Sequence, residues 1–247
     1  FKVMNASKRV DFIKNWITDY VQSMPKKAST LVVGVSGGID SAVVSTISSM
    51  TGLKTFVLSM PIKQIKTQDD LSKLHCKWLV SNFKNVSYLN VDLDNVFSGF
   101  ENALGKNNSE HAFANSRARL RMVTLYQVAG SNNGIVVGTG NKVEDFGVGF
   151  YTKYGDGGVD ISPIADCTKS QVWEMGEFLE IDHKIINAPP TDGLWVDGRN
   201  DEDQLGMTYK ELEEAMENPK SKNYSKYLKI RENNLHKMKE IPVCKFD

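Results

Sequence analysis

The segment from residue 31 to residue 41, Leu-Val-Val-Gly-Val-Ser-Gly-Gly-Ile-Asp-Ser, constrains the fold of this chain more than any other. A run of apolar, mostly β-branched residues leads into two adjacent glycines and then into residues that suit a helix, which predicts a buried strand, a tight turn and a helix start. Adjacent glycines let the backbone approach an anion closely, and the amide groups and dipole of a helix N-terminus attract it. The segment therefore predicts a phosphate-binding corner.

The last two residues of this corner, Asp40-Ser41, distinguish it from a Walker A loop. A Walker A loop ends in Lys-Ser/Thr, and its lysine neutralises the β and γ phosphates. A carboxylate beside phosphates requires a cation between them, and Mg²⁺ binds one or two carboxylates together with phosphate oxygens. The alternative is an ordinary strand–turn–helix corner in which Asp40 is the helix N-cap.

Strand and helix patterns alternate along the first 140 residues. Strands are expected at 31–35, 55–58, 86–91 and 135–138, and helices at 10–24, from 41 to near 52, at 67–83, 92–104 and 111–130. This alternation predicts an α/β fold: a doubly wound, mostly parallel sheet with helices on both faces. Ligands of such sheets bind beyond the carboxyl ends of the strands. The two glycine-bearing strand exits, 37–38 and 138–140, should therefore open at one edge.

Three further local patterns complete the expected organisation of the chain. Capping boxes are expected at Thr67-Asp70 and at Thr168-Gln171, each at the start of a helix. Residues 187–206 are rich in Asn, Pro, Gly and Asp, and a loop of that length is usually functional or disordered. A charged helix is expected at about 223–240.

Composition excludes several classes of protein. The 247 residues permit one large α/β domain over 1–247, and 30 basic residues balance 30 acidic ones, so no global field attracts nucleic acid. No run of eighteen apolar residues and no signal-like start are present, which predicts a soluble, cytoplasmic protein with no membrane partner. Three distant cysteines without a Cys-x-x-Cys pair suit a reducing compartment and argue against a zinc site.

A second strand-to-helix turn, Gly138-Thr139-Gly140-Asn141-Lys142-Val143-Glu144, also ends in a carboxylate. If both turns face one crevice, Asp40 and Glu144 can hold Mg²⁺ from two sides. The alternative is that Glu144 only complements the N-terminus of a helix.

Two groups of charged residues are further candidates. Arg117, Arg119 and Arg121 lie two apart on a predicted helix, about 200° around its axis, so Arg119 should face away from the other two. The Gly-rich loop at 155–158 is surrounded by charges of both signs, and a lysine there can reach an anionic substrate or a leaving pyrophosphate. These charges are Lys153, Asp156, Asp160 and Lys169. The alternatives are ordinary surface arginines and a solvent-exposed turn.

The pattern Ser-Gly-Gly-Ile-Asp-Ser at 36–41 resembles the pyrophosphate loop of the N-type ATP pyrophosphatases, which include NAD, GMP, asparagine and argininosuccinate synthetases. Four other parts of the chain resemble the ammonia-dependent NAD synthetases in particular. These are Gly138-Thr139 with Glu144, Asn-Ser-Arg-Ala-Arg-Leu-Arg-Met at 115–122, Phe-Tyr-Thr-Lys-Tyr-Gly-Asp-Gly-Gly-Val-Asp at 150–160 and Pro-Thr-Asp-Gly-Leu-Trp at 190–195. The similarity covers essentially the whole chain, and Arg117, where many relatives have lysine, is one departure.

The resemblance implies an adenine nucleotide alpha hydrolase-like fold and a ligase that forms NAD, AMP and pyrophosphate. Its substrates would be deamido-NAD, ATP and ammonia, and its intermediate an adenylated nicotinate carboxylate, in the last step of NAD biosynthesis. The length leaves no room for a glutaminase domain. The resemblance further implies a homodimer with the dinucleotide bound at the subunit interface.

The resemblance also assigns roles to individual residues. Mg²⁺ would be bound by Asp40 and Glu144, and Asp40, Lys153 and Lys169 would act in catalysis. Deamido-NAD would contact Arg119, Lys153, Asp160, His236 and Lys237. ATP would contact the residues of the first corner and three others: Gly34, Val35, Ser36, Gly37, Gly38, Ile39, Asp40, Ser41, Thr139, Lys169 and Thr191.

Two rival functions share parts of this pattern. A GMP synthetase-like or tRNA-modifying enzyme would have the loop at 36–41 but should lack the 150–160 block, and a tRNA enzyme should carry a basic surface. A nucleotide-sensing module would bind ATP without turnover, and the presence of both Asp40 and Glu144 counts against it.

Overall fold

The structure is a computed structural model that describes residues 4–191, 193–194 and 199–246. Its centre is a four-stranded parallel sheet with the order β3-β2-β1-β4. The strands are β1 (Thr30–Gly34), β2 (Lys54–Ser59), β3 (Val86–Asn90) and β4 (Gly134–Val136). All four predicted strands are therefore confirmed, although β4 ends before Val137, which instead forms an isolated parallel bridge with Ile161.

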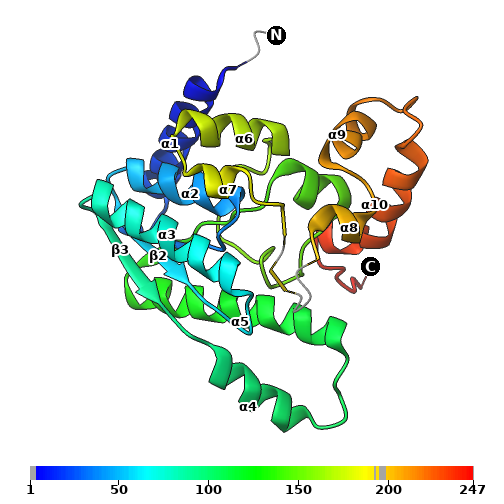
Figure 1. Ribbon diagram of the computed structural model, residues 1–247, viewed down its shortest axis with the longest axis horizontal. Coiled ribbons are helices and arrows are strands. Elements are labelled where there is room, and N and C mark those ends of the chain that lie inside the picture. The colour runs from blue at the N-terminus through cyan, green and yellow to red at the C-terminus, as the bar shows by residue number, and fades with distance from the viewer. Residues whose placement is uncertain (1–3, 192, 195–198, 247) are drawn as a thin grey trace.

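Helices cover both faces of the sheet, as the α/β prediction requires (Figure 1). Leu31 and Val33 pack against α1 (Ala6–Ser23), α2 (Ile39–Met50) and α6 (Lys169–Phe178). Val32, on the opposite face of β1, packs beneath α4 (Asp94–Leu104) and α5 (Glu110–Ser131). Since side chains alternate along a strand, these neighbouring residues serve two separate cores. The helix α3 (Lys66–Asn82) covers β2 and β3 on the side of α2.

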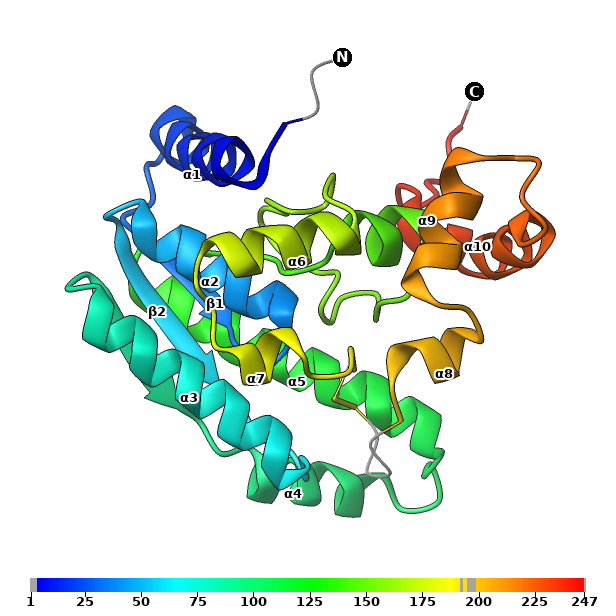
Figure 2. The same ribbon diagram turned by 45° about the horizontal axis from the view of Figure 1, so that its top comes forward.

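The remaining elements form a smaller unit around their own apolar cluster. It contains the π-helix η1 (Val143–Val148), α8 (Asp201–Leu205), α9 (Tyr209–Glu217) and α10 (Tyr224–Met238). The short helix α7 (His183–Ile186) instead packs through Ile185 into the core shared by α2 and α6. Figure 2 shows α8, α9 and α10 grouped beyond one end of α6, on the side away from α3. The helix expected at about 223–240 is present as α10. The segment 187–206 was expected to be a loop, but it contains α8. Asp192 and residues 195–198 of that segment lie outside the described residues.

The two predicted capping boxes have different outcomes. Thr168 and Gln171 form one at the start of α6, where it fixes the position of Lys169. The prediction at Thr67 is wrong, because α3 begins one residue earlier, after Ile65, without a side-chain cap.

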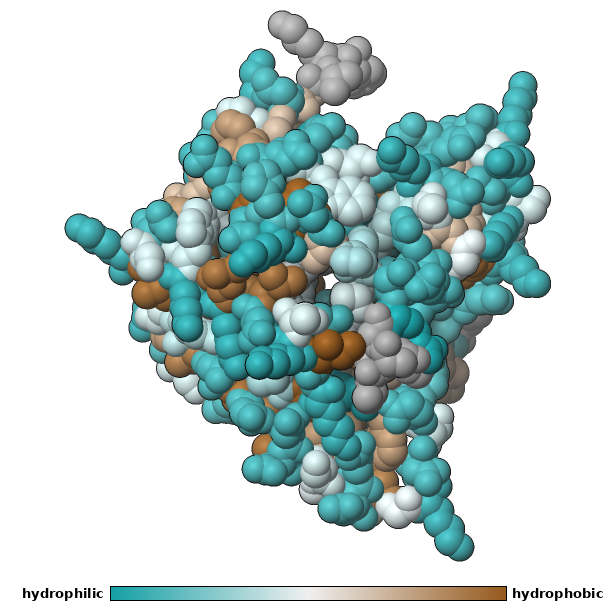
Figure 3. Space-filling view, in the orientation of Figure 1, coloured by the Kyte–Doolittle hydropathy of each residue, from teal (hydrophilic) through white to brown (hydrophobic). Residues whose placement is uncertain are grey.

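In the view of Figure 3 hydrophilic residues dominate, and apolar residues form small separate patches. None of the described helices is long and apolar enough to cross a bilayer.

Candidate active site

The first corner, between β1 and α2, is built as the glycine pattern predicts. Gly37 has φ of +94°, and a Cβ there would lie 2.6 Å from the backbone oxygen of Gln68, so only glycine fits. The Ser41 hydroxyl accepts a hydrogen bond from the Ser36 amide at 3.0 Å and closes the turn. The N-cap of α2 is Gly38, which supplies no side-chain cap, so the alternative that Asp40 is the N-cap is wrong. The first-turn amides of α2 are therefore suited to an anion.

The second corner, after β4, reaches the first through Asn141. This fully buried side chain accepts hydrogen bonds from the amides of Val143 and Glu144 at 3.0 and 3.1 Å, and it donates one to Asp40 Oδ1 at 3.3 Å. Asn141 therefore satisfies the first amides of η1, while the carboxylate of Glu144, in the first turn of that helix, contacts Lys169 and Tyr209. The close approach of the chain explains Gly138, where a Cβ would lie 2.6 Å from Val159 Cγ2.

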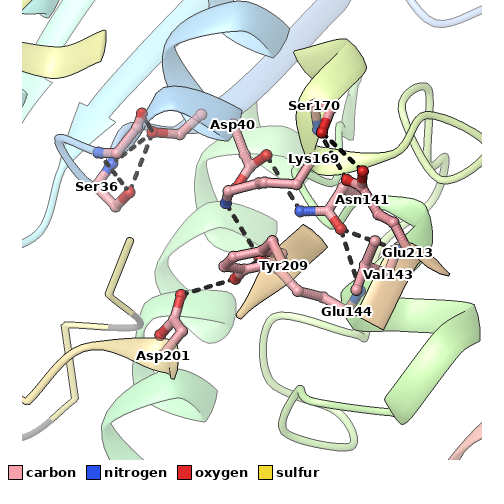
Figure 4. A network of polar contacts seen from close by, with 12 residues as sticks. Ser36, Asp40, Asn141, Val143, Glu144, Lys169, Ser170, Asp201, Tyr209 and Glu213 are labelled. Carbon is pink, nitrogen blue, oxygen red and sulfur yellow. Dashed lines mark hydrogen bonds and ion pairs between the residues drawn. The ribbon is translucent and has the colours of Figure 1, made fainter. Parts of the chain in front are cut away.

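Lys169 joins the carboxylates of the two corners (Figure 4). Its ammonium group contacts Asp40 Oδ2 and lies 3.2 Å from Glu144 Oε1, while the residue is only 2% exposed. The rings of Tyr209 and Trp173 lie 4.8 and 6.0 Å from Nζ, which places the ammonium between two anions and two aromatic rings. The structure therefore brings Asp40, Glu144 and Lys169 together.

Burial governs the protonation of these groups. Burial raises the pKa of Asp40 from 3.8 to about 6, although Lys169 works in the opposite direction. Burial alone would lower the pKa of Lys169, but Asp40 and Glu144 outweigh it and raise that pKa. The pKa of Asp145, a neighbour in the same cavity, rises to about 8 through burial and the nearby Glu144 and Asp156. The cavity thus concentrates acidic groups around one buried cation.

The carboxylate pair has the donor chemistry of a magnesium site. Within the described residues no group of three or more His, Cys, Asp or Glu side chains is arranged to hold a metal alone. Mg²⁺ typically uses one or two carboxylates and completes its shell with phosphate oxygens and water. Asp40 and Glu144 provide two such carboxylates, and both already gather around a cation, the Lys169 ammonium. The residues present therefore fit Mg²⁺ bound together with a phosphate.

One cavity contains most of the predicted ATP residues. Its lining includes Thr139 and Thr191 from two different segments, together with Asp40, Glu144 and Lys169. Residues of the first corner complete this wall: Gly34, Val35, Ser36, Gly38, Ile39 and Ser41. Gly37 lies within the corner but is not in the cavity wall, because its role is to form the turn.

None of the five predicted dinucleotide residues lines this cavity, and four of them form two pairs. The exposed Arg119 donates through Nε to the Lys153 carbonyl at 3.1 Å, so these two residues lie side by side. Lys237 donates to the carbonyl of Tyr151 at 2.7 Å and thereby joins α10 to the same loop, next to the exposed His236.

Asp160 lies at another point of that loop. Its carboxylate accepts hydrogen bonds from the Tyr126 hydroxyl at 3.1 Å and the Val136 amide at 2.7 Å. It is thus held between α5 and β4.

The three arginines of α5 divide as helical geometry predicts. Arg117 is buried and pairs with Glu110 at 2.7 Å, and Arg121 lines the cavity and donates to the Met60 carbonyl at 2.9 Å. Arg119 lies on the exposed side, as expected. The hypothesis of plain surface charges is wrong for Arg117 and Arg121.

Sequence reasoning missed Asn141, Asp201 and Tyr209, three polar residues of this site. Asn141 directly follows the second glycine turn, so its position was a usable signal. Asp201 and Tyr209 belong to α8 and α9, and no local pattern predicts that Tyr209 contacts both Glu144 and Asp201.

Fold and site together define an adenine nucleotide alpha hydrolase-like α/β protein, with its site at the carboxyl ends of two neighbouring parallel strands. The family model for NAD synthase matches residues 9–245, and the chain belongs to this family.

Individual relatives agree with this placement. The NH(3)-dependent NAD(+) synthetase of Carboxydothermus hydrogenoformans is 37% identical over 216 residues, 85% of each chain. The NMN synthetase of Francisella tularensis superposes with a TM-score of 0.90 at 31% identity, covering 98% of this chain and 100% of that one. The NH3-dependent NAD synthetase of Campylobacter jejuni superposes with a TM-score of 0.77 at 25% identity, with the same coverage.

Proposed function

We propose that this chain is an ammonia-dependent NAD synthetase that converts deamido-NAD, ATP and ammonia to NAD, AMP and pyrophosphate. The observation that carries the proposal is the meeting of Asp40, Glu144 and Lys169 beside the glycine corner at 36–41. This arrangement suits a nucleotide whose phosphates lie against helix amides while cations neutralise their charge. Family membership supports the choice of substrates.

The reaction explains why these residue types suffice. The nicotinate carboxylate attacks the α-phosphorus of ATP, the bond to pyrophosphate breaks, and an acyl adenylate forms. Ammonia then attacks the carbonyl carbon, the bond to AMP breaks, and loss of a proton leaves the amide of NAD. Negative charge grows on the departing pyrophosphate, where the Lys169 ammonium and the amides of α2 stabilise it. Mg²⁺ bound by Asp40 and Glu144 would add positive charge at the phosphates.

The remaining roles belong to the same proposal. Arg119, Lys153, Asp160, His236 and Lys237 would bind deamido-NAD, and Thr139 and Thr191 would contact ATP. Lys153 would also assist catalysis. We propose a single synthetase domain over 1–247 that works as a cytoplasmic homodimer, with ammonia as its nitrogen source.

The direct test is to incubate the protein with ATP, MgCl₂, deamido-NAD and ammonium, and to measure NAD and AMP by chromatography. We expect NAD and AMP in equal amounts, and far less NAD when glutamine replaces ammonium. Release of ADP, or AMP without NAD, would contradict the proposed reaction.

A second candidate acceptor follows from the superposition with the Francisella tularensis NMN synthetase. Its TM-score of 0.90 exceeds the 0.77 of the Campylobacter jejuni NAD synthetase. The same adenylation and amidation chemistry would convert nicotinate mononucleotide to its amide. Comparing kcat/KM for deamido-NAD and nicotinate mononucleotide decides between them, and a higher value for the mononucleotide would replace our first choice.

The rate should fall on the acidic side of about pH 6. Because the pKa of Asp40 is raised from 3.8 to about 6, a proton occupies this carboxylate below that pH and excludes a metal ion. We expect a decline of about tenfold per pH unit below the midpoint, and a lower midpoint at higher Mg²⁺ concentration. The contribution of Asp40 to folding stability has the opposite trend: it is present below about pH 4 and is lost as pH rises through 6. A rate that stays level down to pH 5 would contradict the assignment.

Replacing Arg119 with alanine should weaken binding of the acceptor more than binding of ATP. Arg119 is exposed and lies beside Lys153, outside the cavity that contains the predicted ATP residues. Loss of one charge-assisted hydrogen bond, about 1.5 kcal/mol, corresponds to a roughly tenfold rise in the KM of deamido-NAD. The KM of ATP serves as the internal control, and an equal rise in both would remove this role from Arg119.

A further inference from the structure

Tyr209 has a buried hydroxyl group that points toward carboxylates of the candidate active site (Figure 4). The residue is 1% exposed, and its hydroxyl lies 2.6 Å from Glu144 Oε1 and 3.1 Å from Asp201 Oδ2. Burial and these two carboxylates raise the pKa of the hydroxyl, so it stays protonated and acts as a donor. Nothing in the chemistry of adenylation requires this group, so its position calls for another explanation.

The ring of Tyr209 is held as firmly as its hydroxyl. It packs edge-on against Trp173 with 6.2 Å between the ring centroids, and it lies 4.8 Å from Lys169 Nζ. Tyr209 OH and Lys169 Nζ therefore approach the same oxygen of Glu144, Oε1. Since a carboxylate carries lone pairs on both oxygens, Oε2 keeps its capacity to bind a cation.

Tyr209 also connects Glu144 to a distant part of the cavity wall. Its amide donates to Glu202 Oε1 at 3.0 Å, and its hydroxyl contacts Asp201. The amide of Asp201 in turn donates to the carbonyl of Pro190 at 2.9 Å, and Pro190 lines the cavity. The Tyr209 side chain therefore links α9 to η1 and α8, and the backbone of Asp201 continues this connection to Pro190.

We propose that Tyr209 is a positioning residue: its hydroxyl fixes the orientation of Glu144 for a divalent cation and ties that carboxylate to the Pro190 segment. The proposal rests on the assignment of Glu144 to Mg²⁺ in the proposed function. Partners that orient metal-binding carboxylates typically contribute 10–100-fold to metal affinity or activity.

The test compares Tyr209→Phe with a matched control, Tyr227→Phe. Tyr227 is a second buried tyrosine, 7% exposed, in the same apolar cluster. Mn²⁺ binding is measured by electron paramagnetic resonance in the presence of a non-hydrolysable ATP analogue. We expect roughly tenfold weaker Mn²⁺ binding for Tyr209→Phe and a similar rise in the Mg²⁺ concentration that gives half-maximal rate. Tyr227→Phe should leave both values unchanged.

A double-mutant cycle shows whether the effect passes through Glu144. In a Glu144→Gln background, Tyr209→Phe should have no further effect on Mn²⁺ binding. Unchanged Mn²⁺ binding by Tyr209→Phe, an equal effect of both tyrosine variants, or unfolding of Tyr209→Phe would overturn the proposal. Failure of the proposed function is a different result, because the unmodified protein would then form no NAD at any Mg²⁺ concentration.

Discussion

Replacing Asp40 with asparagine is expected to slow AMP formation by about 10²–10³-fold while the protein remains folded. The substitution keeps the size of a half-buried side chain at the first corner but removes the charge that a metal ion needs. Because the N-cap of α2 is Gly38, the helix keeps its start. Lys169 keeps Glu144 as a partner at 3.2 Å. Rates at saturating substrates, with circular dichroism and thermal unfolding, measure the two expected results separately.

A suitable control is Asp166→Asn. The Asp166 side chain is 98% exposed and pairs with Lys142 at 3.1 Å on the surface, so the same chemical change there should alter neither rate nor stability appreciably. Near-normal turnover by Asp40→Asn would remove Asp40 from the metal site. A drop in rate that high Mg²⁺ concentration fully restores would instead assign Asp40 to metal affinity alone.

The sheet and the first corner could be predicted from the sequence because each depends on residues that are adjacent in the chain. An apolar β-branched run predicts a buried strand, and the paired glycines at 37 and 38 predict the turn. The parallel order of β1 and β4 then places both corners at one edge of the sheet, so the meeting of Asp40 and Glu144 followed from topology. Lys169 was a candidate both as a charge near the Gly-rich loop and through the resemblance, but its burial between these carboxylates was not expected.

The parts that sequence reasoning missed depend on contacts between distant segments. Tyr209 reaches Glu144 across 65 positions of sequence, and no periodicity in α9 marks one tyrosine as polar-facing and buried. The π-helix η1 was expected only as the start of a helix, since local patterns do not distinguish π from α geometry. The capping box predicted at Thr67 shows a different error. The residues there match the local motif, but α3 begins one residue earlier, at Lys66, so Thr67 is not the N-cap.

Among the substitutions proposed here, replacing Lys169 with methionine should produce the largest loss of folding stability. The substitution keeps an unbranched buried chain but leaves Asp40 and Glu144 together without their cation. Removing one partner from a buried ion pair typically costs about 3–5 kcal/mol of unfolding free energy. Urea unfolding measures this loss. The control, Lys142→Met, removes an ammonium from a side chain that is 42% exposed, where an ion pair contributes at most about 1 kcal/mol.

The dependence on Mg²⁺ and pH identifies the source of that loss. If both carboxylates bind the metal, millimolar MgCl₂ should restore part of the stability of Lys169→Met, because a ligand that binds only the folded state stabilises it. Lys169 holds the pKa of Asp40 down, so its removal should raise that pKa further above the value in the unfolded chain. A folded-state pKa raised in this way makes stability fall as pH increases, so the variant should be least stable at neutral pH and recover toward pH 5. A variant that is equally destabilised at both pH values, with no response to Mg²⁺, would mean that Lys169 contributes packing alone and that the two carboxylates do not form a cation site.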